Sequence, residues 1–124
     1  MLKLVLYGTP VTKKNSERIW INQKTNKPFI APSKAYKAYE KDCGKQIAAA
    51  YKQHIDVPIN LKCVYYMPNK RKVDLCNLLG ATCDILVKFG VIADDNSAIV
   101  KRHDGSRVLV DKANPRVEIE IEEV

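Results

Sequence analysis

The sequence predicts an α/β protein of the α+β type, a small single domain in which a mixed sheet packs against two main helices. Three observations indicate this fold class. The 124 residues are 46% hydrophobic and 28% charged, which suits one modest core. Two long stretches, 33–53 and 74–89, repeat apolar residues at helical spacing, and several shorter stretches alternate polar and apolar residues as strands do. We therefore expect residues 1–124 to form one domain.

The start of the chain reads as a strand followed by a hairpin. Residues 2–8 alternate weakly between polar and apolar side chains and stop at the turn Gly8-Thr9-Pro10. A polar and basic loop, 11–18, then leads to two short apolar segments, Ile19-Trp20-Ile21 and Phe29-Ile30. Two such segments around a polar connection are typical of a hairpin.

The middle of the chain predicts a helix and then a strand. Ser33 is suited to cap a helix, and an apolar stripe at helical spacing continues to a helix end near Gln53. Residues 59–67 alternate as a strand does, and Pro68-Asn69 ends it. The basic run Lys70-Arg71-Lys72 follows, so the strand leads into positive charge.

The last part of the chain predicts a second helix and three more strands. The helix starts at Asp74 and ends before Gly90, since glycine commonly follows a helix end. Its core-facing side chains recur on one face: Leu75, Leu78, Leu79, Thr82, Ile85, Leu86 and Phe89. After a polar turn, residues 98–103 and 108–110 predict two short strands, and 117–122 alternates strictly as a third.

The balance of charge favours a polyanionic partner. The chain has 21 Lys and Arg against 14 Asp and Glu, a formal net charge of +7, and such a field attracts nucleic acid. No stretch approaches the roughly 20 apolar residues of a membrane span, and the start is too soon polar for a secretory signal. The four cysteines form no C-x-x-C pair and lie at no zinc-ligand spacing from a histidine. We expect a cytoplasmic protein with reduced thiols and no membrane partner.

Acidic residues around the second predicted helix could serve phosphodiester hydrolysis. This reaction needs a positioned water and positive charge on the phosphorus oxygens, which Mg²⁺ held by carboxylates commonly supplies. Asp74 could hold a metal, although an aspartate at a helix start is more often a cap. Asp94-Asp95-Asn96 could contribute as well, although these residue types are common in turns because they bond their own backbone.

The spacing of the acids limits which of them can meet. Asp84 lies on the same helical face as Asp74 but ten residues, or roughly 15 Å, further along, so one ion cannot bind both. If segment 89–94 is extended, it can run back along the helix and bring Asp95 towards Asp74.

Two basic runs flank these acids in the sequence, Lys13-Lys14 and Lys70-Arg71-Lys72. Each run alone is more often an ordinary solvated surface, but an endonuclease needs positive charge on phosphates beside its metal site. Trp20 could wedge into an opened branch point of DNA, although packing in a core or a dimer is the commoner role.

The segment MPNKRKVDLCNLLGATCDIL at 67–86, followed by GVIADD at 90–95, resembles the catalytic core of the RusA-type Holliday junction resolvases. The pattern of that family is a basic run, D-L-D-N-L-x-K-A, a helical D-x-L, a glycine and a D-D pair. The spacing of Asp74, Asp84 and Asp94-Asp95 matches without a gap. An early proline with a basic, Asn-containing loop, 10–15, and a mid-chain helix are also similar, so the likeness covers most of the chain.

The resemblance implies a homodimer that cuts four-way DNA junctions with Mg²⁺ or Mn²⁺ and no small-molecule cofactor. It implies that Asp74, Asp94 and Asp95 form the catalytic and metal-binding set, in which Asp74 and Asp95 bind the metal and Asp94 assists. The residues expected to contact DNA are Lys13, Lys14, Asn15, Lys70, Arg71, Lys72 and Asn77. A protein of this kind would be encoded by a bacterium or a phage, associate with the nucleoid and act in recombination and repair.

Two positions depart from the family pattern. Cys76 stands where the second motif aspartate is expected, and its soft sulfur suits Mg²⁺ poorly. Gly80 stands where a lysine is expected, so Lys70, Lys72 or a lysine of the 11–18 loop would have to replace it. Two alternatives therefore stay open: a junction-binding or architectural protein that has lost cutting, and a basic RNA-binding protein whose acids are only caps and turns.

Overall fold

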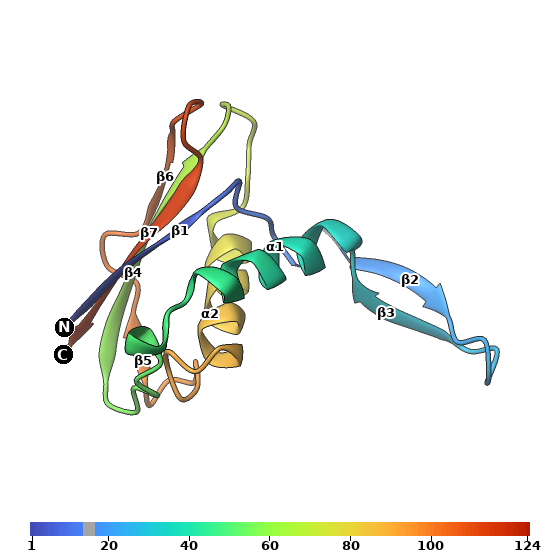
Figure 1. Cartoon of the computed structure of the whole chain (residues 1–124), viewed down its shortest axis with the longest axis horizontal. Helices are drawn as coiled ribbons and strands as arrows, with labels where there is room; N and C mark the ends of the chain where they lie inside the picture. Colours follow the sequence, from blue (N-terminus) through green and yellow to red (C-terminus); the bar gives the residue numbers. More distant parts are fainter. Residues whose placement is uncertain (14–16) are drawn as a thin grey trace.

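The computed structural model describes residues 1–13 and 17–124 and has a five-stranded mixed sheet with two helices on one face (Figure 1). The strands of this sheet are β1 (Leu2–Tyr7), β4 (Ile59–Met67), β5 (Val100–Arg102), β6 (Arg107–Val110) and β7 (Arg116–Glu123). The helices are α1 (Lys34–Gln46) and α2 (Leu75–Lys88). The predicted α+β class is confirmed.

β7 lies in the middle of the sheet, between β1 and β4, and runs antiparallel to both. Its strict alternation puts Val117, Ile119 and Ile121 on the buried face. Ile119 lies opposite Leu4 on one side and Cys63 on the other, so its side chain is surrounded by apolar neighbours of both adjacent strands. The alternation that predicted this strand is therefore the pattern of a half-buried central strand.

β5 and β6 form an interrupted edge along β4, and both run parallel to it. The interruption is held by hydrogen bonds. The backbone N–H of Asp104 donates to Asn60 Oδ1 at 2.8 Å, and the backbone N–H of Cys63 donates to Ser106 Oγ at 3.0 Å. His103 Nδ1 lies 2.9 Å from the Leu61 carbonyl oxygen. These contacts satisfy polar groups of β4 where the edge strand is absent.

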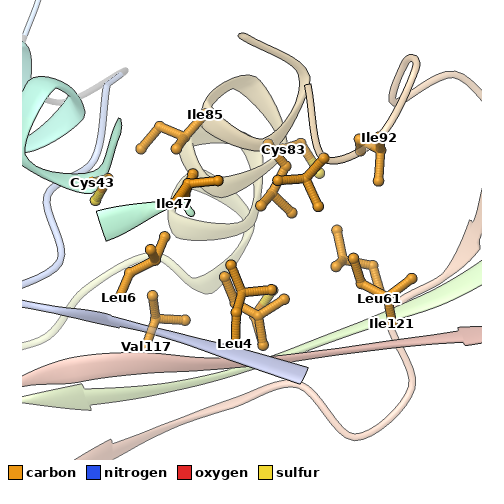
Figure 2. Packing of buried hydrophobic residues seen from close by; sticks show 14 of the residues in the cluster. Leu4, Leu6, Cys43, Ile47, Leu61, Cys83, Ile85, Ile92, Val117 and Ile121 are labelled. Carbon is orange, nitrogen blue, oxygen red and sulfur yellow. The ribbon is translucent and has the colours of Figure 1, made fainter. Parts of the chain in front are cut away.

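The core lies between the helices and the buried face of the sheet (Figure 2). Leu4 and Leu6 of β1 point towards α2, from which Ile85 and Cys83 point back (Figure 2). One buried hydrogen bond crosses this layer, because the Tyr65 hydroxyl of β4 lies 2.7 Å from Thr82 Oγ1 of α2. Packing and this bond together fix which face of α2 is turned outward.

The predicted hairpin forms a separate two-stranded sheet, β2 (Glu17–Ile21) and β3 (Pro28–Pro32). Figure 1 shows it as an arm that projects beyond the N-terminal end of α1, away from the main sheet. The connection between its strands, 22–27, is exposed throughout.

The first helix is shorter than predicted. It ends at Gln46 instead of near Gln53, and only a 3-10 turn, Ala49–Tyr51, follows. Ile47 takes an extended conformation and is 4% exposed, so the chain leaves the helix to place this side chain in the core. Burial of an isoleucine outweighs the helix preference of the alanines that follow it.

The second helix begins and ends as predicted, with Asp74 as its N-cap and Gly90 beyond its end at φ 80°. The segment after it does not form an extended strand along the helix. The backbone N–H of Val91 donates to the Leu86 carbonyl at 2.8 Å, and Ile92 makes a single parallel bridge to Ile55. These backbone bonds hold the following turn close to the helix, in place of the extended return along the helix that was considered from the sequence.

Candidate active site

A hollow of about 390 Å³ lies along the outer face of α2. The residues that line it come from three segments and are Lys13, Cys76, Asn77, Gly80, Ala81, Asp84 and Asp95. A second hollow of about 320 Å³ shares Cys76, Gly80 and Asp95 with the first and reaches His103. Asp95 thus stands at the junction of the two hollows.

Helical spacing brings the residues of α2 to this face. Asn77, Ala81 and Asp84 are four and three residues apart, and neighbours at these distances lie on one side of a helix. The other side packs into the core through Leu78 and Ile85, which are both 1% exposed. The polar wall of the hollow and the core face of α2 are therefore two consequences of one amphipathic pattern.

Asp95 reaches the hollow from the turn after α2. The turn is closed by Asp94, whose Oδ1 accepts a hydrogen bond from the backbone N–H of Asp95 at 2.8 Å and whose Oδ2 accepts one from Asn96 Nδ2 at 2.7 Å. The hydrogen bond from the Asp95 backbone, followed by that from Asn96, lowers the pKa of Asp94 below its usual value. Asp94 thus orders the turn, and its neighbour is the acid that lines the hollow.

Asp84, which the sequence separated from Asp74, lies with Asp95 in the same hollow. The pKa of the buried Cys83 thiol reflects the negative charges of both acids. Burial raises the pKa of its thiol to about 12, and the negative charges of Asp95 and then Asp84 contribute to the rise. Sequence reasoning left Asp84 out of the site, and its place on the same helical face as Asn77, seven residues earlier, is the signal that could have included it.

Asp74 has a different place. It does not line the hollow, and its Oδ1 accepts hydrogen bonds from the backbone N–H groups of Cys76 at 2.9 Å and Asn77 at 3.3 Å. It therefore caps α2 at the end from which the polar face begins. Cys76 is exposed and forms part of the wall where a second aspartate was expected.

The predicted DNA-binding residues are distributed around this face. Lys13 lines the hollow, and its Nζ lies 3.4 Å from Asp84 Oδ2. Asn77 lines the hollow too. Lys70, Arg71 and Lys72 are exposed in the segment that leads into α2. Lys14 and Asn15 lie outside the described residues.

The donor set of the hollow suits a hard divalent cation only in part. Within 1–13 and 17–124, no group of three or more His, Cys, Asp and Glu side chains is placed to hold a metal ion. Mg²⁺ nevertheless keeps several waters and commonly binds one or two carboxylates together with phosphate oxygens of a substrate. The carboxylates present fit a site of that kind, which the phosphate of a substrate would complete.

Comparison with known proteins gives one family. The family model described as endodeoxyribonuclease RusA matches residues 8–122, which is nearly the whole chain. No curated protein matches the sequence. Among the helices of the described ranges, none has the length and apolar character needed to cross a membrane.

Proposed function

Because the chain belongs to the RusA endodeoxyribonuclease family, we propose that it resolves four-way DNA junctions and related branched DNA by metal-dependent hydrolysis of phosphodiester bonds. The observation that supports this proposal is the hollow beside α2, which is lined by the acids Asp84 and Asp95 and by the cation Lys13. A site that cuts DNA has to combine carboxylates with positive charge for the phosphate. Recombination and repair are the processes in which such an activity serves.

We assign the metal, Mg²⁺ or Mn²⁺, to Asp95, which lines the hollow, and to Asp74, which does not line it but matches the first aspartate of the family pattern. When bound, it would offset negative charge on the phosphorus oxygens and lower the pKa of a water molecule. Asp94 assists by holding the turn that directs Asp95, through the bonds to the Asp95 backbone and to Asn96. Asp84 is not assigned to the metal because it lies ten residues after Asp74, or roughly 15 Å along the helix, so one ion cannot bind both.

The exposed run Lys70-Arg71-Lys72 is assigned to the DNA backbone on either side of the cut. Contacts between such cations and phosphates fix the position of a duplex without reading its sequence. The run leads directly into α2, so phosphates bound there would guide the strand towards the polar face of that helix.

We also propose that the protein acts as a homodimer. A four-way junction presents two equivalent strands, and a two-fold symmetric dimer carries two equivalent sites. Light scattering in solution should give twice the 14.0 kDa mass of the chain.

A labelled synthetic four-way junction tests the proposed function. We expect paired nicks with Mg²⁺ or Mn²⁺, no nicks with EDTA, and none with Asp95→Asn. Asp56→Asn is the matched control, since Asp56 is also an exposed aspartate but does not line the hollow. Nicks that persist in Asp95→Asn would contradict the site assignment.

The same assay separates the two alternatives. Tight binding to the junction without any nicks in the unmutated protein would favour an architectural role, as the replacement at Cys76 allows. If linear duplex and single-stranded RNA compete as well as the junction, the RNA-binding alternative is favoured over a preference for branched DNA.

A further inference from the structure

The hollow beside α2 contains a basic group that does not come from the helix. Of the described residues that line it, Lys13 is the one that carries positive charge, and it belongs to the segment after β1. Its neighbour Thr12 is 8% exposed, so the backbone is anchored immediately before Lys13. The position of the lysine is thus set by the fold although the residue lies in a loop.

One residue of α2 contributes no side chain to the lining of this hollow. Gly80 lies four residues after Cys76 and four before Asp84, on the face that lines the hollow. A Cβ atom built on Gly80 would meet nothing within 4 Å, so the space above this residue is open. An entering phosphate could approach the helix backbone there more closely than at any residue with a side chain.

The ion pair between Lys13 and Asp84 is suited to exchange. Its atoms are 3.4 Å apart, and the two side chains are 41% and 45% exposed. An ion pair this exposed is weak in water, and a phosphate can replace the carboxylate or share the ammonium group with it at little cost. Asp84 therefore keeps Lys13 directed into the hollow without sequestering it.

We propose that Lys13, positioned by Asp84, binds a nonbridging oxygen of the phosphate that is cut and stabilises its charge in the transition state. The inference rests on the proposed function. In this reaction a water oxygen bonds to phosphorus and the bond from phosphorus to one sugar oxygen breaks. One proton of the water passes to the departing sugar oxygen and the other to solvent, which leaves a phosphate monoester and a hydroxyl. Lys13 stays protonated throughout.

The test compares single-turnover cleavage of the junction at saturating protein with the affinity for the uncut junction. Lys13→Met should slow cleavage roughly a hundredfold, the scale seen when one group that stabilises transition-state charge is removed. Affinity should fall much less, because the other phosphate contacts remain. Lys13→Arg should recover most of the rate. Lys52→Met is the control, since Lys52 is exposed and does not line the hollow.

A second substitution makes the test specific. Gly80→Lys adds an ammonium group to the same hollow from α2, and a Cβ atom at this position has open space around it. In the Lys13→Met background, Gly80→Lys should restore at least a tenth of the unmutated rate, whereas Gly80→Ala should restore nothing. Asp84→Asn should slow cleavage less than Lys13→Met and add no further loss to it. Thermal unfolding of each variant by circular dichroism checks that the fold is kept.

The outcomes distinguish this inference from the proposed function. If the unmutated protein cuts no branched DNA, the proposed function fails and the inference fails with it. If the unmutated protein cuts but Lys13→Met cuts equally fast, the inference alone is overturned. Equal losses of rate and affinity in Lys13→Met, without rescue by Gly80→Lys, would reduce Lys13 to a simple DNA contact and also overturn it.

Discussion

Asp74 has one observed role, as a helix cap, and one proposed role, at the metal, and a single substitution would not separate them. It caps α2 through its bonds to the backbone N–H groups of Cys76 and Asn77, and the proposed function also assigns it to the metal. An N-cap needs only a side-chain oxygen, whereas a hard divalent cation requires the charged carboxylate. Two variants therefore separate the roles.

Asp74→Ala should lower the free energy of unfolding by about 1 kcal/mol, and Asp74→Ser should lower it by only a few tenths, because serine also caps. Both variants should lose junction cleavage. The measurements are urea unfolding and single-turnover cleavage. If Asp74→Ser cuts DNA at the unmutated rate, Asp74 is a cap alone.

At the site, the sequence could not predict which of the candidate residues lie together in the hollow. Sequence reasoning named Asp74, Asp95 and Lys13 as site residues, but it compared the position of Asp84 only with that of Asp74. Asp84 forms an ion pair with Lys13 and meets Asp95 in the lining of the same hollow. That meeting depends on backbone bonds between residues 91–93 and both the end of α2 and Ile55. Such bonds depend on the packing of segments far apart in sequence, which helical spacing does not encode.

At the scale of the elements, the contact between α2 and β4 sets the direction in which the polar face of α2 points. The Tyr65 hydroxyl and Thr82 Oγ1 are buried and 2.7 Å apart. Tyr65→Phe leaves Thr82 without this partner, and a buried polar group left unpaired costs about 1 to 3 kcal/mol. We expect this loss in the free energy of unfolding by urea.

The double variant Tyr65→Phe with Thr82→Val removes both polar groups and should be closer to neutral than Tyr65→Phe alone. Tyr66→Phe is the matched control. Its ring lies 3.8 Å from the Arg116 guanidinium carbon, and phenylalanine keeps that contact, so stability should change by less than about 0.5 kcal/mol. A double variant less stable than either single variant would show that the hydrogen bond is not what the two residues contribute.

The elements with the strongest periodicity were predicted best. The strand predicted over 117–122 is β7 (Arg116–Glu123), and the helix predicted from Asp74 is α2 (Leu75–Lys88). The end of α1 was wrong because burial of Ile47 decides it. The parallel pairing of β5 and β6 with β4 could not be predicted, because alternation indicates a strand but not its partner.

At the scale of the whole molecule, the net charge of +7 predicts strong dependence of DNA affinity on salt. Each phosphate neutralised contributes about 0.9 to the slope of log affinity against log salt. Replacing Lys70, Arg71 and Lys72 together by alanine should therefore reduce the slope by about 2.7, if all three contact duplex phosphates.

The assay is a salt titration of binding to an uncut junction. Lys70→Arg with Lys72→Arg keeps the charge and should keep the slope, so it is the matched control. An unchanged slope in the triple alanine variant would show that this run does not contact DNA.

The central position of β7 affects how the protein folds during its synthesis. β1 is made first, yet its partner in the sheet is β7, the last strand of the fold. Until β7 is synthesised, β1 and the edge of β4 that pairs with β7 lack their common neighbour. The core beneath α2 then also lacks Val117, Ile119 and Ile121. Pairing over so long a sequence separation is also slow. The sheet that supports the polar face of α2 is therefore completed only after residues 116–123 have left the ribosome, so a chain that lacks them also lacks the support of the candidate site.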